Sequence, residues 1–128
     1  MRPRGPISAA VEEFRIYEER SPAGTVVLVL RGEADLHVAP AVRDRLLEAV
    51  SSGASAIVVD LTDVTFVDSM MLGALLGALK RMQGSGEFRV VVSSREIRRL
   101  FEITLLDRVF SLDQSREAAL QAIEQPAA

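Results

Sequence analysis

Two aspartates, Asp35 and Asp68, and one serine, Ser69, have the types and positions to do chemistry. Asp35 follows an apolar run that ends at Leu30, and Asp68-Ser69 lies between a second apolar run and an apolar stretch of helical length. Sites in open α/β sheets tend to lie at the carboxyl ends of strands, so we expect these residues at one edge of a sheet. A simpler interpretation stays open, because a serine or aspartate here can cap the helix and contribute about 1 kcal/mol.

Catalysis by Ser69 would need a base, and His37 is the only histidine of the chain. The chain has no Gly-x-Ser-x-Gly turn of the kind that holds the nucleophile of α/β-hydrolases, so a small serine hydrolase is a distant alternative.

The sequence has no glycine loop of the kind that binds the phosphates of a nucleotide. The glycine-rich segment at 84–86 follows a predicted helix, whereas a phosphate-binding loop precedes one. Without cysteine, and with one histidine, the chain lacks the ligands of a thiolate or multi-histidine metal site. We predict no catalytic residue, no metal and no cofactor.

The helix predicted from about Met70 to Gln83 is apolar on nearly all sides. A leucine-rich face should meet the sheet, while the opposite side carries small residues and a methionine where an exposed helix normally carries charge. Two glycines inside it each cost about 1 kcal/mol relative to alanine. Either this side docks on another protein, or the third helix of the chain covers it. The predicted partner-binding residues are Met70, Met71, Gly73, Ala74 and Gly77.

The composition limits the class of partner. The chain has 128 residues, 48% hydrophobic and 26% charged, as one folded domain would have. Its net charge of -3 argues against nucleic acid, since proteins that bind the phosphate backbone are usually basic. The longest apolar run, Met70 to Leu79, is shorter than the roughly 20 residues that cross a bilayer, and the N-terminus does not resemble a secretory signal. We expect a cytoplasmic protein that binds neither nucleic acid nor membrane.

The hydrophobic pattern alternates strands with helices after an opening hairpin of two strands, Phe14–Glu19 and Thr25–Leu30. Further strands are predicted at 56–61, 88–92 and 109–112, and helices at 39–50, 70–83 and 97–105, with a last helix capped by Asp113. This pattern predicts an α/β fold: a single domain with a mostly parallel sheet of four to five strands, packed with about four helices. Residues 1–10, rich in proline, glycine and arginine, are predicted to be a disordered tail, and 11–125 the domain.

Two sequence motifs occur in order along this predicted domain. The first, LRGEADL, occupies residues 30–36 and is followed by Ala39-Pro40 and Arg43, and the second, IVVDLTDVTFVDSMMLGALL, occupies residues 57–76. Both resemble the STAS domain of bacterial anti-sigma-factor antagonists. The resemblance covers about 12–124, which identifies 11–125 as a STAS domain.

This resemblance implies a function in partner switching. An antagonist of this family binds an anti-sigma factor, which is a small kinase of the histidine-kinase-like ATPase fold, and thereby frees a sigma factor. The kinase inactivates the antagonist by phosphorylating the serine after the aspartate, which is Ser69 here, and a phosphatase restores it. The matching acidic residues, Asp35 and Asp68, are implied to line the phosphorylation site.

The chain departs from the family pattern directly after Ser69. The family usually reads Asp-Ser-Ser/Thr-Gly-Leu, whereas this chain reads Asp68-Ser69-Met70-Met71-Leu72. A glycine there lets a partner backbone approach closely, and the two methionines add bulk and apolar surface instead. The alternative within the family is a STAS interaction subunit of a transport or stressosome-like assembly, without phosphorylation.

Overall fold

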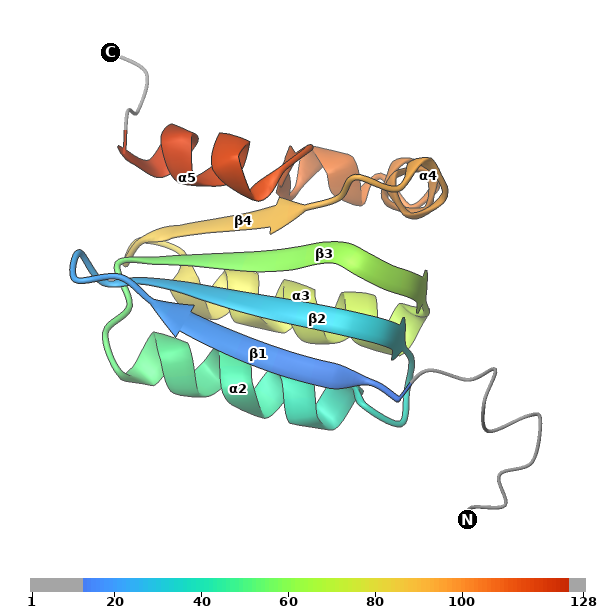
Figure 1. Cartoon of the computed structure of the whole chain (residues 1–128), viewed down its shortest axis with the longest axis horizontal. Helices are drawn as coiled ribbons and strands as arrows, with labels where there is room; N and C mark the ends of the chain where they lie inside the picture. Colours follow the sequence, from blue (N-terminus) through green and yellow to red (C-terminus); the bar gives the residue numbers. More distant parts are fainter. Residues whose placement is uncertain (1–12, 125–128) are drawn as a thin grey trace.

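A computed structural model describes residues 13–124 as strands and helices that alternate along the chain (Figure 1). A short 3-10 turn, η1 (Leu106–Arg108), follows the third helix in sequence. The strands are β1 (Arg15–Arg20), β2 (Thr25–Ala34), β3 (Ala56–Val67), β4 (Glu87–Val91) and β5 (Ser111–Asp113). The helices are α2 (Ala39–Ser51), α3 (Ser69–Met82), α4 (Arg95–Ile103) and α5 (Arg116–Glu124).

The strands form one five-stranded sheet in the order β1-β2-β3-β4-β5. β1 pairs antiparallel with β2, and every other neighbouring pair is parallel. Gly24 lies in the turn between β1 and β2 with φ +93°, a conformation that glycine adopts without the steric cost of a Cβ. The predicted α/β class, the opening hairpin and the mostly parallel sheet are confirmed.

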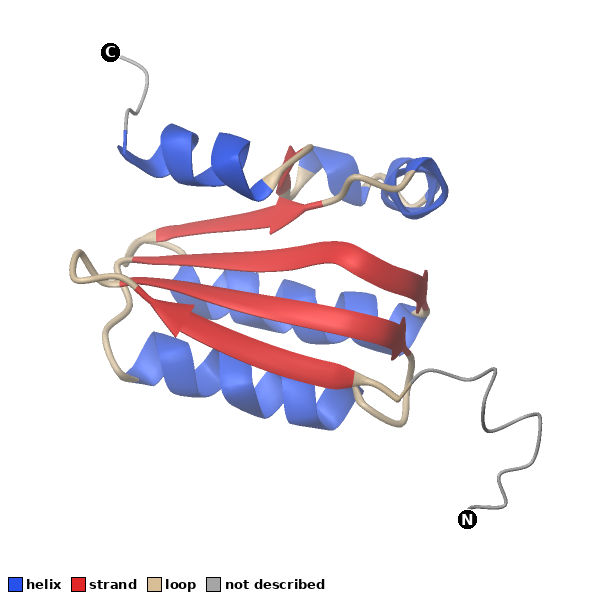
Figure 2. Ribbon diagram, in the orientation of Figure 1, coloured by secondary structure: helices blue, strands red, loops and turns tan. Residues whose placement is uncertain are grey.

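The helices divide between the two faces of the sheet (Figure 2). α2 and α3 lie side by side on one face, where Leu28 and Leu30 of β2 point into the main core. Val27 and Val29 point to the other face, where Ala119 of α5 packs against them. Burial on both faces explains why β2 is a continuous apolar run, without the alternation of a half-buried strand.

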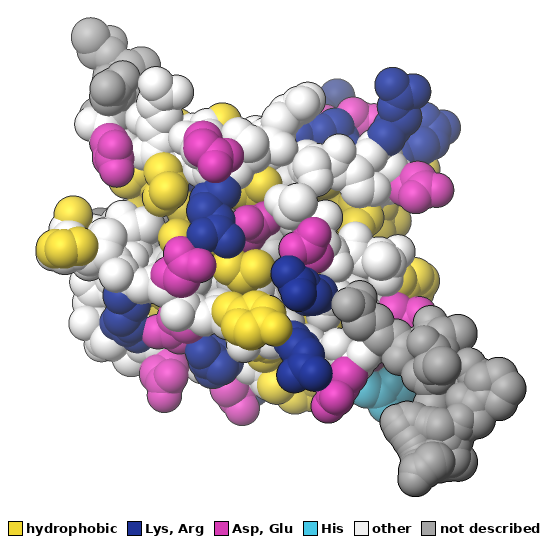
Figure 3. All heavy atoms as spheres, in the orientation of Figure 1, with side chains coloured by type: hydrophobic (Ala, Val, Ile, Leu, Met, Phe, Trp, Pro, Cys, Tyr) yellow, Lys and Arg dark blue, Asp and Glu magenta, His cyan; other side chains and the backbone are white. Residues whose placement is uncertain are grey.

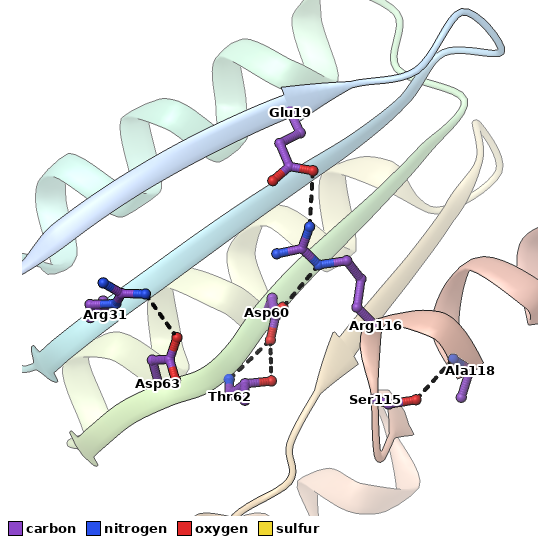
Figure 4. Close-up of polar contacts among 8 residues, drawn as sticks. All are labelled: Glu19, Arg31, Asp60, Thr62, Asp63, Ser115, Arg116 and Ala118. Carbon is purple, nitrogen blue, oxygen red and sulfur yellow. Dashed lines mark hydrogen bonds and ion pairs between the residues drawn. The ribbon is translucent and has the colours of Figure 1, made fainter.

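A polar network fastens the start of α5 to the sheet (Figure 4). Arg116 Nε donates to Asp60 Oδ2 at 3.2 Å, and its Nη1 donates to Glu19 Oε1 at 2.9 Å. Asp60 is only 4% exposed, and its other oxygen accepts from the backbone N–H of Thr62 at 3.0 Å. Burial disfavours the charge of Arg116, but the hydrogen bonds to Glu19 and Asp60 outweigh this effect and raise its pKa. Figure 3 shows acidic and basic side chains intermixed over this face of the molecule.

β2 and β3 are longer than predicted. β2 continues past its predicted end at Leu30 to Ala34, and β3 continues past Leu61 to Val67. The two extensions pair with each other across register shifts. Such irregularities break the strict alternation of side chains, so the sequence pattern stops before the strands do. Gly32 has φ +104°, and a Cβ there would lie 3.2 Å from the Cα of Phe14.

The predicted cap of the last helix is also wrong. α5 begins at Arg116, and Ser115 Oγ accepts the hydrogen bond from the backbone N–H of Ala118 at 3.1 Å. Asp113 ends β5 instead, and its carboxylate accepts from Arg89 Nε at 2.7 Å. The tail expected at residues 1–10, and the first two and last residues of the domain expected at 11–125, lie outside the described residues.

Candidate functional site

Asp68 joins two loops at one edge of the sheet. Its Oδ1 accepts a hydrogen bond from the backbone N–H of Met71 at 3.0 Å, which caps the N-terminus of α3. Its Oδ2 accepts from the backbone N–H of Leu36 at 2.7 Å, in the loop before α2. Both oxygens therefore have backbone partners, and the capping interpretation of Asp68 is confirmed.

Asp35 shapes the loop that Asp68 holds. Its Oδ1 accepts from the backbone N–H of His37 at 2.9 Å and lies 3.6 Å from His37 Nδ1. Its carbonyl oxygen accepts from the N–H groups of Val38 and Ala39 at 3.1 and 3.0 Å, where α2 begins. Asp35 and Asp68 therefore lie at the same edge of the sheet, as predicted. Both carboxylates accept hydrogen bonds from backbone N–H groups, and these bonds hold the loop before α2 and the start of α3 in place.

Ser69 is the first residue of α3 and is exposed. Within residues 13–124 its hydroxyl makes no hydrogen bond, because Asp68 already caps the helix. The side chain of His37 is 80% exposed and its near neighbour is Asp35, so the base that a hydrolase needs is not paired with Ser69. The hydroxyl is available to another molecule at a helix N-terminus, where backbone N–H groups favour negative charge.

Met71 does not belong to an exposed surface, and its prediction as a partner-binding residue is wrong. It is 0% exposed, whereas Met70 is 59% exposed. The buried stripe of α3 includes Met71, Leu75 and Met82, which recur at helical spacing and enter the main core. Met71 therefore adds volume to the core, and of the two methionines only Met70 adds apolar surface beside Ser69.

The outer side of α3 is formed by Met70, Gly73 and Gly77, all of them exposed. The alternative that the chain's third helix covers this side is wrong, since α3 packs along α2 and α4 lies beyond β4 (Figure 1). A Cβ built on either glycine would meet nothing within 4 Å, so no internal contact requires glycine there. Each glycine still costs the helix about 1 kcal/mol relative to alanine. Ala74 is 7% exposed and faces α2.

A hollow of about 240 Å³ opens between the first turns of α2 and α3. Gly73 and Ser69 both lie in its wall. Its lining is Ala39, Pro40, Arg43, Ser69, Met70, Gly73 and Ala74. The hollow is therefore continuous with the uncharged side of α3 and with the free hydroxyl.

Sequence reasoning missed two exposed apolar residues at this edge, Leu36 and Phe66. They are 53% and 48% exposed, and both lie close to Asp68: Leu36 donates its N–H to it, and Phe66 precedes it by two residues. Apolar side chains left exposed next to a polar site are typical of surfaces that bind another protein. A leucine directly after Asp35 in a polar segment was the signal that could have identified the first of them.

The groups exposed at this edge are of kinds that contact another molecule. Among residues 13–124, no group of three or more His, Cys, Asp or Glu side chains could hold a metal ion. No helix in the same range is long and apolar enough to cross a membrane. What the edge offers another molecule is a hydroxyl, an uncharged helix face and exposed apolar side chains.

Comparisons of sequence and of structure with known proteins agree on one family. A family model of the STAS domain matches residues 17–119. The anti-sigma-F factor antagonist RsfB of Mycobacterium tuberculosis is 32% identical over 100 residues, which are 78% of this chain and 82% of RsfB. An anti-sigma factor antagonist from Mycobacterium paratuberculosis superposes with a TM-score of 0.82 at 28% identity, covering 88% of this chain and 96% of that one. The phosphorylated form of the Bacillus cell fate determinant SpoIIAA has a TM-score of 0.69 at 25% identity, covering 85% and 99%.

The fold and the site define a small α/β domain with exposed apolar side chains and an uncharged helix face at the carboxyl edge of its sheet. The chain belongs to the STAS domain family and, within it, to the anti-sigma-factor antagonists. These are regulatory binding proteins and not enzymes.

Proposed function

We propose that this protein binds an anti-sigma factor of the histidine-kinase-like ATPase fold and thereby frees a sigma factor. The bound kinase phosphorylates Ser69, the phosphorylated protein no longer binds, and a phosphatase restores the active form. The observation that carries the proposal is the uncharged, uncovered side of α3, which starts beside the free hydroxyl of Ser69. RsfB, a relative over most of the chain, is named for antagonism of an anti-sigma factor, which supports the same partner class.

Three features support Ser69 as the phosphorylated residue. Its hydroxyl is exposed and makes no hydrogen bond within residues 13–124. A phosphate adds a charge of about -1.5 to -2, and a helix N-terminus tolerates this charge, so the fold should survive the modification. SpoIIAA, a structural neighbour, is known in a phosphorylated form.

The methionines that follow Ser69 differ in their effect on a kinase. Met71 is 0% exposed, so a kinase bound at the surface does not touch it. Met70 is 59% exposed and is the side chain that such a kinase must accommodate. If the kinase cannot do so, the protein binds without being phosphorylated and acts as a constitutive antagonist.

A binding titration tests the docking surface. Each anti-sigma factor of this fold from the source organism is purified and titrated against the protein by calorimetry. Gly73→Arg should abolish the binding seen with wild type, because it places an unpaired charge in the middle of the interface. Gln83→Arg is the matched control, since Gln83 is exposed at the far end of the same helix. Equal affinity for wild type and Gly73→Arg would contradict the docking site.

Intact-mass measurement tests the switch. Incubation with the bound kinase and ATP should add one phosphate to wild type and none to Ser69→Ala, and fragmentation should locate it on Ser69. A phosphate on another residue would refute the assignment. Binding without any phosphate, also in Met70→Ser, would favour the alternative of a STAS interaction subunit in a transport or stressosome-like assembly.

A further inference from the structure

The hollow between α2 and α3 has one charged residue in an otherwise uncharged wall. Apart from Ser69 and Arg43, its lining consists of alanine, proline, methionine and glycine. Its volume is about 240 Å³. An apolar cavity of about 150 Å³ is enough to bind benzene, so this hollow has room for a branched aliphatic side chain.

Gly73 keeps the hollow open. A Cβ at this position would meet no heavy atom within 4 Å, so a larger residue would fit without disturbing the fold. Glycine is nevertheless the poorest helix former apart from proline. The small residue therefore leaves space that the folded chain itself does not use, and that space is the hollow.

Arg43 is free to pair with a carboxylate from outside. Arg45, two residues further along α2, donates from Nη2 to Glu18 at 3.1 Å. Arg43 is exposed and has no ion-pair or hydrogen-bond partner for its side chain among residues 13–124. A cation at the edge of an apolar hollow complements an acidic group placed next to an apolar one.

We propose that the hollow takes an aliphatic side chain of the partner protein and that a carboxylate next to it in the partner pairs with Arg43. This inference rests on the proposed function, because it specifies what the anti-sigma factor presents to this surface. It also connects the hollow with the switch, since Ser69 lies in the same wall and a phosphate there would compete with the carboxylate for Arg43.

Two small probes test the hollow without the partner. Acetyl-Leu-Glu-amide and acetyl-Leu-Gln-amide have the same size and differ in one charge. Each is titrated to about 50 mM, a range suited to Kd values in the millimolar region, into the ¹⁵N-labelled protein at low salt. The acidic probe should shift the backbone amides of Met70 and Gly73 and bind about two- to fivefold more tightly than the neutral one, as expected for an exposed ion pair.

Variants separate the two parts of the site. Arg43→Gln should make the two probes bind equally, and Gly73→Leu should abolish the shifts by filling the hollow. Gly77→Leu is the matched control, because a Cβ at Gly77 also meets nothing within 4 Å but this residue does not line the hollow. Amide spectra of the free variants show whether each is folded.

Equal binding of the two probes to wild type would refute the ion pair, and the occupant would then be purely apolar. The absence of shifts at Met70 and Gly73, or shifts centred on the hollow beside α5 at Val27, Leu120 and Ile123, would refute the site itself. Because the probes need no anti-sigma factor, failure of such a protein to bind would refute the proposed function separately.

Discussion

Met70 and Met71 are neighbours in the sequence but lie in opposite environments, so their truncation should have opposite effects. Met71 is 0% exposed within the main core, and Met70 is 59% exposed beside Ser69. Removing a buried methionine side chain costs about 2–5 kcal/mol, so Met71→Ala should lower the free energy of unfolding by that amount. Met70→Ala should change it by less than about 0.5 kcal/mol.

Urea denaturation followed by far-UV circular dichroism measures this difference, since the chain has no tryptophan. With an m-value of about 2 kcal/mol per molar, the midpoint of Met71→Ala should fall by about 1–2.5 M and that of Met70→Ala should hardly move. Binding to the anti-sigma factor should show the reverse: Met70→Ala loses about fivefold in affinity, and the folded fraction of Met71→Ala loses none. Equal destabilisation by both substitutions would refute the orientation of α3.

Asp68→Ala should lower the free energy of unfolding by about 1–2 kcal/mol through loss of the α3 cap, and a change below 0.3 kcal/mol in urea titration would show that the cap is not needed. Ser69→Asp should leave the melting temperature within about 2 °C of wild type but weaken partner binding at least about tenfold by calorimetry, and unchanged affinity would contradict the switch. Arg116→Ala should cost about 3 kcal/mol, because it leaves the 4%-exposed Asp60 without its cation, and a neutral result would mean that the network does not fasten α5. Hydrogen bonds from Arg20 and Arg45 hold the pKa of Glu18 below the usual value of a glutamate, so the stability that the ionised Glu18 contributes is present above that usual value and is lost as the pH falls through the lowered pKa. Glu18→Gln should therefore flatten the acid limb of the stability profile, and an unaltered limb would refute this assignment.

The sequence predicts the order of strands and helices well, because most elements here have one clear period. The alternation at Phe14–Glu19 and the β-branched run at Thr25–Leu30 correspond to β1 and to the buried part of β2. The location of Asp35 and Asp68 at the same edge of the sheet follows from the parallel strands, whose carboxyl ends meet there. Register shifts, in contrast, leave no local signal, so the extension of β2 through residues 31–34 was not predicted.

The rotation of α3 about its axis could not be derived from the sequence. A helix that is apolar on nearly all sides has no single hydrophobic face, so the pattern does not decide whether Met70 or Met71 points inward. The hollow at Gly73 depends on how α2 packs beside α3, which no spacing within either helix specifies. The exposed positions of Leu36 and Phe66 likewise depend on the contact between the loop before α2 and Asp68.

Release of a sigma factor is the most direct test of the proposed function. A preformed complex of sigma factor and anti-sigma factor is mixed with increasing amounts of this protein, and free sigma factor is measured by size-exclusion chromatography. We predict that wild type and Ser69→Ala release the sigma factor stoichiometrically, whereas Gly73→Arg and Ser69→Asp release little. Retention of the sigma factor in the presence of excess wild-type protein, with each anti-sigma factor of the kinase-like fold from the source organism, would contradict the proposed function.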